Sequence, residues 1–82
     1  MNSILQKAIA KTIRELRHKK GLSQEGLAHA CDLDRTYISG IERMTRNPTI
    51  KSLEKIISAL GESEKNFFMH VIEELPNEKT EN

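Results

Sequence analysis

The sequence SQEGLAHACDLDRTYISGIER, residues 23–43, decides the fold of this chain. It contains two short helical segments separated by Asp32, Leu33 and Asp34. Ser23 and Asp34 are good N-caps, because their side-chain oxygens can accept hydrogen bonds from unpaired amides of the first turn. We therefore predict helices over residues 24–31 and 35–44. The second carries polar and basic side chains along one face, as a helix presented to a DNA groove does.

The two sides of the predicted helix 35–44 differ in chemistry. Ile38 and Ile41 share the side expected to face the core. The opposite side carries four residues at helical spacing: Thr36, Ser39, Gly40 and Arg43. An ordinary solvent-exposed helix would carry Glu and Lys at these positions. Short hydroxyls, a glycine and an arginine instead favour close approach to a ligand.

Three more amphipathic segments surround this pair. Apolar residues recur every three or four positions over residues 3–20, 50–60 and 64–75, which predicts helices there. The stripe of the fourth helix is expected to face the core and consists of Ile50, Leu53, Ile56, Ile57 and Leu60. The predicted fold is therefore all-α, with five helices in a single domain over residues 1–75 and a disordered polar tail over residues 76–82.

Glycines, hydroxyl residues and a proline mark where these helices begin and end. Gly21 and Gly61 follow two of the helices and are expected to be left-handed. Thr49 and Ser63 precede the last two helices and are expected to cap them. Met44–Pro48 is predicted to be a loop, because Asn-Pro disfavours helix for the residue before proline.

Composition excludes several classes of protein. Of the 82 residues, 37% are hydrophobic and 30% are charged, which is ordinary for a globular domain, and no apolar run approaches the roughly 20 residues of a membrane helix. The N-terminus lacks the apolar stretch of a secretory signal. Cys31 is the one cysteine, so no intramolecular disulfide is expected. These features predict a cytoplasmic protein.

Charge is distributed unevenly along the chain. Residues 11–51 hold nine Lys and Arg against five acidic residues, whereas residues 52–82 hold three against seven. A basic middle and an acidic end indicate a surface for a polyanion in the first part and a different surface in the second. Scattered solvated charge is the alternative interpretation.

Helix 64–75 has a wider apolar face than a single small core needs. Four of its residues are predicted to form a dimer interface: Phe67, Phe68, Val71 and Ile72. DNA-binding proteins of this size generally act as dimers, which favours this interpretation. In the alternative, the helix folds back onto helices 3–20 and 50–60 and nothing protrudes.

No catalytic, metal or cofactor site is predicted. His18, His29 and His70 lie on separate helices, and Cys31 has no second cysteine with which to bind a metal. Gly-rich phosphate loops and nucleophile elbows are absent from the sequence. We therefore expect neither an enzyme nor a small-molecule ligand.

The stretch GLSQEGLAHACDLDRTYISGIERMTRNPTIKSLEKI, residues 21–56, resembles the Cro and phage-repressor (XRE) type of helix-turn-helix domain, which includes lambda repressor. The resemblance covers roughly residues 5–73. DRTYISGIER followed by RNPTIKSLEKI is more specifically similar to the controller proteins of restriction-modification systems. Two residues depart from the family pattern: Gly26 replaces a common acidic residue, and Met44 replaces a frequent glycine near the end of the third helix.

The resemblance implies a function. Controller proteins are homodimeric transcription regulators that bind palindromic operators ahead of their own gene and the endonuclease gene, and adjacent dimers can occupy one operator. The implied partners are an operator duplex, a second copy of the chain and RNA polymerase. Two alternatives stay open: a partner-binding helix-turn-helix protein such as an antitoxin, and a phage or plasmid repressor.

In such a domain the third helix enters the major groove, and this placement assigns roles to individual residues. Arg35 is expected to bind guanine O6 and N7, with a phosphate contact or a surface ion pair as the alternative. The full base-reading set is Arg35, Thr36, Tyr37 and Ser39, with Tyr37 also able to donate to phosphate. The residues expected to contact the DNA backbone are Arg17, Gln24, Arg43, Arg46, Asn47 and Ser52. Asp34 would repel phosphate, so it is assigned to capping.

Overall fold

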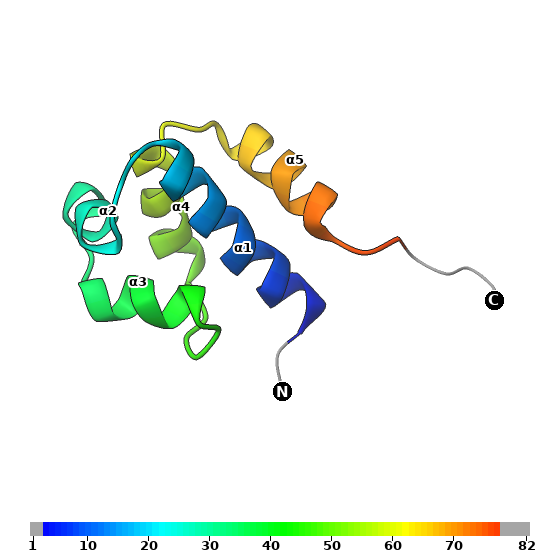
Figure 1. Ribbon diagram of the computed structural model, residues 1–82, viewed down its shortest axis with the longest axis horizontal. Coiled ribbons are helices and arrows are strands. Elements are labelled where there is room, and N and C mark those ends of the chain that lie inside the picture. The colour runs from blue at the N-terminus through cyan, green and yellow to red at the C-terminus, as the bar shows by residue number, and fades with distance from the viewer. Residues whose placement is uncertain (1–2, 78–82) are drawn as a thin grey trace.

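The computed structural model describes residues 3–77 and contains five α-helices in that range (Figure 1). Their bounds are α1 Ile4–Lys19, α2 Gln24–Cys31, α3 Arg35–Glu42, α4 Ile50–Ala59 and α5 Glu64–Glu74. The predicted all-α, five-helix fold is confirmed. Most of the predicted tail, residues 78–82, lies outside the described range.

Each helix contributes a fully buried side chain to one core. These are Ile13, Leu27, Ile38, Ile56 and Phe67, each with 0% exposure. Burying an aliphatic or aromatic side chain of this size contributes about 1.5–3 kcal/mol, so the core holds all five helices together. α1 packs against α3 and α5, and α4 packs against α2 and α5. In Figure 1, α2 and α3 therefore form one end of the molecule, with α5 on the far side of α1.

Hydrogen bonds at the helix ends confirm most of the predicted caps. Ser23, Thr49 and Ser63 accept from the amides of Gly26, Ser52 and Asn66 at 2.9, 3.0 and 3.0 Å. Gly21 and Gly61 have φ values of +78° and +75°, which favour glycine after a helix.

Two predictions about helix ends are wrong. Asp34 has the backbone conformation of an N-cap, but its side chain makes no capping hydrogen bond. α3 ends at Glu42 rather than at residue 44, because Met44 adopts a left-handed φ of +64°. The amides of Thr45 and Arg46 then both bond to the carbonyl oxygen of Gly40, at 2.8 and 3.1 Å, which turns the chain away from the helix.

The predicted core stripe of α4 is wrong at its first residue. Ile50 is 74% exposed, whereas Leu53, Ile56, Ile57 and Leu60 are buried. Helical spacing places Ile50 on the same side as the others, but no part of the described chain covers this first residue of α4, although Ser52 and Leu53 of the same turn are buried. None of the helices within residues 3–77 is long and apolar enough to cross a bilayer.

Candidate nucleic-acid interface

The turn between α2 and α3 is set by its own backbone bonds. Asp32 is left-handed, with φ and ψ of 58° and 45°, and the amide of Leu33 donates to the carbonyl oxygen of Ala28 at 2.9 Å. Leu33 packs against the core. These contacts determine the angle at which the chain enters α3, so they orient its outer face.

The outer face of α3 carries hydrogen-bonding groups, and the opposite face of the helix is packed in the core. Ile38 and Ile41 are 0% and 2% exposed, as predicted. Arg35, Thr36 and Arg43 are exposed, and Ser39 is half-buried. We call these four residues, Arg35, Thr36, Ser39 and Arg43, the reading face. A guanidinium and short hydroxyls on a rigid helix suit the edges of bases in a major groove.

Gly40 does not belong to the reading face, which corrects the prediction that it faces outward. It is buried beneath the loop that follows α3. A Cβ atom at this position would lie 2.5 Å from Cγ of Arg46 and 3.3 Å from Oγ1 of Thr45. The absence of a side chain at Gly40 therefore leaves room for the loop, not for a ligand.

The hydroxyl of Tyr37 forms hydrogen bonds at the start of α4. The hydroxyl lies 2.8 Å from Oγ of Ser52 and accepts from the amide of Thr49 at 3.2 Å. The carbonyl oxygen of Asn47 lies 3.4 Å from the same hydroxyl. These bonds give the hydroxyl a role in holding the 46–49 loop, and the expected contact of Tyr37 with a base edge or a phosphate stays a prediction.

Arg46 and Asn47 are exposed at the loop that Tyr37 holds. The guanidinium carbon of Arg46 lies 5.4 Å from the centre of the Tyr37 ring, a cation–π arrangement. The ring limits the directions in which Arg46 can point. A cation positioned in this way beside the reading face is suited to a phosphate.

Ser52 is buried, which contradicts its expected contact with the DNA backbone. Its hydroxyl accepts from Oγ1 of Thr49 and donates to the carbonyl oxygen of Thr49, both at 3.0 Å. With Tyr37 as a further partner, Ser52 joins the start of α4 to α3. Its role in the structure is internal.

Arg17 is also buried, so it is not free to contact phosphate as predicted. Its guanidinium forms two hydrogen bonds with the carboxylate of Glu42, at 2.7 and 2.9 Å, and a third with the carbonyl oxygen of Leu22 at 2.8 Å. Gln24 donates to the same carboxylate at 3.1 Å. This cluster of Arg17, Leu22, Gln24 and Glu42 joins α1, the start of α2 and the end of α3.

The sequence pattern does not predict a role for Glu42. The one indication in the sequence is that Glu42 is an acidic residue beside Ile41 in a segment whose other charged residues are arginines. Its partner Arg17 is 25 residues away, so the sequence pattern does not connect the two. Gln24 is half-buried, and its amide nitrogen has a second hydrogen that Glu42 does not use. Gln24 can therefore still face a ligand at the start of α2.

The predicted dimer residues of α5 separate into two pairs. Phe67 and Val71 are 0% and 2% exposed and belong to the core of the chain, which corrects their assignment to an interface. Phe68 and Ile72 are 41% and 62% exposed. Phe68 also lines a groove with Ile50, Leu53 and Ile57 of α4. Three of the exposed apolar side chains, Ile50, Phe68 and Ile72, make up what we call the α4–α5 apolar surface.

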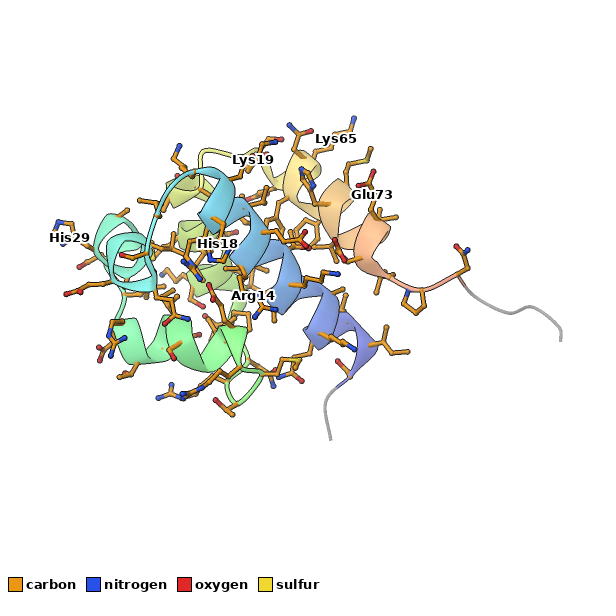
Figure 2. All side chains as sticks on the ribbon, viewed as in Figure 1. Arg14, His18, Lys19, His29, Lys65 and Glu73 are labelled. Carbon is orange, nitrogen blue, oxygen red and sulfur yellow. The ribbon has the colours of Figure 1, made fainter. Side chains whose placement is uncertain are left out.

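The histidines and the cysteine are not gathered into a site. Figure 2 shows His29 pointing outward from α2, away from His18 on α1. Within residues 3–77 no group of three His, Cys, Asp or Glu side chains could hold a metal ion. Cys31 is buried, and burial raises the pKa of its thiol above the usual value.

Comparison with known proteins identifies relatives with the same arrangement. Residues 13–66 match the helix-turn-helix family HTH_3. The control protein C.BamHI of Bacillus amyloliquefaciens is 45% identical over 67 residues, which cover 80% of this chain and 83% of that protein.

Solved structures of the restriction-modification controller protein C.Esp1396I have the same fold as this chain. One is bound to a 19-base-pair DNA duplex, with 48% identity, a TM-score of 0.86, and coverage of 92% of this chain and 100% of that one. Another is a tetramer in complex with its natural 35-base-pair operator, with 49% identity, a TM-score of 0.85, and coverage of 89% and 96%.

Proposed function

The chain belongs to the helix-turn-helix family that includes the control proteins of restriction-modification systems, and we propose that it is a homodimeric, sequence-specific DNA-binding regulator of transcription in such a system. The observation that carries this proposal is the reading face on a fold shared with a controller bound to DNA. The family is one of DNA-binding regulators and not of enzymes. A regulator of bacterial operators acts in the cytoplasm.

In the proposed complex, α3 lies in the major groove and the start of α2 faces the phosphate backbone. Arg35, at the beginning of α3, binds the O6 and N7 acceptors of a guanine with its two-pronged guanidinium. Thr36 and Ser39 present hydroxyls to neighbouring base edges. Arg43, Arg46 and Asn47 bind phosphates, as does the unused amide hydrogen of Gln24.

Two copies are needed because one reading face makes few base contacts. A twofold dimer presents two α3 helices to half-sites about one helical turn apart, roughly 34 Å. The α4–α5 apolar surface is the proposed interface, since it leaves three large apolar side chains uncovered. Binding of adjacent dimers and contact with RNA polymerase stay predictions of the family resemblance.

Selection of bound duplexes from a random pool, at fixed salt, tests the proposal. We expect one palindromic motif to be enriched. The Arg35→Ala variant should lose its preference for that motif by about fivefold or more per half-site, because a bidentate base contact contributes about 1–3 kcal/mol of discrimination. Arg14→Ala removes the same charge from the exposed side of α1 (Figure 2) and should keep the preference.

Two results would contradict this assignment. If no motif is enriched, the chain is not a sequence-specific regulator. If Arg35→Ala weakens binding to the motif and to random DNA by the same factor, Arg35 contacts phosphate rather than a base. A monomeric mass in solution, with dimers forming only in the presence of another protein, would favour the partner-binding alternative.

A further inference from the structure

Asp34, which directly precedes the reading face, has a carboxylate without a partner among the described residues. The N-cap side chains of the other four helices, Ser3, Ser23, Thr49 and Ser63, all accept a hydrogen bond from the first turn. Asp34 has the same extended backbone, with φ and ψ of −72° and 139°, and its carbonyl oxygen accepts from Tyr37 and Ile38. Its carboxylate makes neither a hydrogen bond nor an ion pair within residues 3–77.

This carboxylate lies where negative charge opposes the proposed function. Asp34 is exposed and precedes Arg35 and Thr36, which are also exposed. A surface that approaches phosphates gains from positive charge, so a free carboxylate weakens binding to every DNA sequence. A serine could cap α3 without that repulsion, as it does for α1, α2 and α5. A capping hydrogen bond therefore does not account for the charge.

The chemistry of the major groove allows few partners for a carboxylate. An ionised carboxylate only accepts hydrogen bonds, and the groove offers donors only at cytosine N4 and adenine N6. Guanine and thymine present acceptors, which repel it. Adenine places its N7 acceptor beside the N6 amino group, whereas cytosine has only a carbon-bound hydrogen there. A carboxylate entering the groove thus favours cytosine over the other three bases.

We propose that Asp34 is a specificity-determining residue that accepts a hydrogen bond from the N4 amino group of a cytosine, within one base-pair step of the guanine bound by Arg35. This inference rests on the proposed function. The donor-only guanidinium and the acceptor-only carboxylate stand next to each other in the sequence, so together they select a guanine and a cytosine. The charge of Asp34 lowers the affinity for all DNA, and it lowers it most for half-sites that lack that cytosine.

The test is selection from a random duplex pool with the wild type, Asp34→Asn and Asp32→Asn at one salt concentration. Asparagine caps a helix as well as aspartate does, so Asp34→Asn should keep the fold, which its urea midpoint checks. Asp32→Asn is the matched control. It removes the same charge two residues away, on an exposed left-handed residue whose conformation asparagine tolerates.

We expect the wild type and Asp32→Asn to require the cytosine, and Asp34→Asn to accept other bases there while still requiring the guanine. Asp34→Asn should also bind random DNA more tightly. If its selected motif is the same as that of the wild type, the role of Asp34 is refuted while the proposed function stands. If the wild type enriches no motif, the proposed function itself fails.

A second measurement needs no variant protein. In the selected duplex the cytosine is replaced by 2-pyrimidinone, which lacks only the N4 amino group. Wild-type affinity should fall by about tenfold per half-site, the size of one good base contact. An unchanged Kd would overturn the proposal, even if Asp34→Asn failed to fold.

Discussion

At the scale of single residues, the buried pair of Arg17 and Glu42 has the largest expected effect on stability. Their side chains are 7% and 3% exposed, so removing one partner leaves a charge without compensation in the core. We expect Glu42→Gln to lower the free energy of unfolding by about 3 kcal/mol or more. The double variant Arg17→Met, Glu42→Leu should recover much of that loss.

Urea unfolding of these variants measures the effect. Lys11→Met is the control, because it breaks a more exposed ion pair, Lys11–Glu74 at 3.1 Å, in which the side chains are 50% and 23% exposed. An exposed pair contributes about 0–1 kcal/mol. Similar losses for Glu42→Gln and Lys11→Met would show that burial of the Arg17–Glu42 pair does not matter to stability.

Arg46 should act on affinity rather than on base preference. It is exposed in the loop beyond the reading face, in contact with the Tyr37 ring. Arg46→Ala should weaken binding to all duplexes by a similar factor and reduce the slope of log K against log salt by about one unit, since one phosphate contact is lost. Fluorescence anisotropy titrations at several salt concentrations give both quantities. A change in the selected motif would instead assign Arg46 to the bases.

At the scale of helices, the glycine within α3 depends on the loop that follows it. A Cβ atom on residue 40 would meet Cγ of Arg46 at 2.5 Å, near the loop backbone, where the chain cannot easily yield. Gly40→Ala gains about 1 kcal/mol in helix propensity, but overpacking costs about 1–3 kcal/mol. We expect a net loss of stability and weaker DNA binding, because the displaced loop carries Arg46.

Gly26 of α2 provides the comparison. A Cβ atom there would meet Oγ of Ser23 at 3.2 Å and Cδ2 of Leu22 at 3.5 Å, both farther away than the 2.5 Å contact at residue 40. Gly26→Ala should therefore be neutral or stabilising by up to about 1 kcal/mol in urea unfolding. If both alanine variants stabilise the protein equally, the 45–46 loop is not packed on Gly40 in solution.

The helices could be predicted from the sequence, because periodicity and capping act between residues three or four apart. Ser23, Thr49 and the glycines after α1 and α4 illustrate this. The internal roles of Ser52 and Gln24 could not be predicted, since their partners Tyr37 and Glu42 lie 15 and 18 residues away. The sequence pattern does not distinguish a polar residue that binds a ligand from one that hydrogen-bonds to another helix.

At the scale of the whole molecule, α5 contributes both to the core of the chain and to its exposed apolar surface. Phe67 and Val71 close the core against the rest of the chain, while Phe68 and Ile72 leave apolar area uncovered. Sequence periodicity placed all four residues on one wide face and could not divide it. The division matters for experiment, because substituting Phe67 or Val71 would unfold the chain, whereas substituting Ile72 can test association alone.

Ile72→Lys should convert the proposed dimer to a folded monomer. Ile72 is 62% exposed in the single chain, so lysine there costs little within the monomer but places a charge in the proposed apolar interface. Sedimentation equilibrium should show half the wild-type mass, with an unchanged helical circular dichroism spectrum. Glu73→Lys, which also introduces a lysine but on the neighbouring exposed position of α5 (Figure 2), should remain dimeric.

DNA binding by the same two variants then separates the contribution of the dimer from that of the reading face. A monomer presents one α3 helix, so Ile72→Lys should bind a full palindrome little better than an isolated half-site, while its base preference within the half-site is unchanged. Wild type and Glu73→Lys should favour the palindrome by a factor of about one hundred or more. If Ile72→Lys remains a dimer, or keeps the full preference for the palindrome, the two copies must meet through a surface other than α4 and α5.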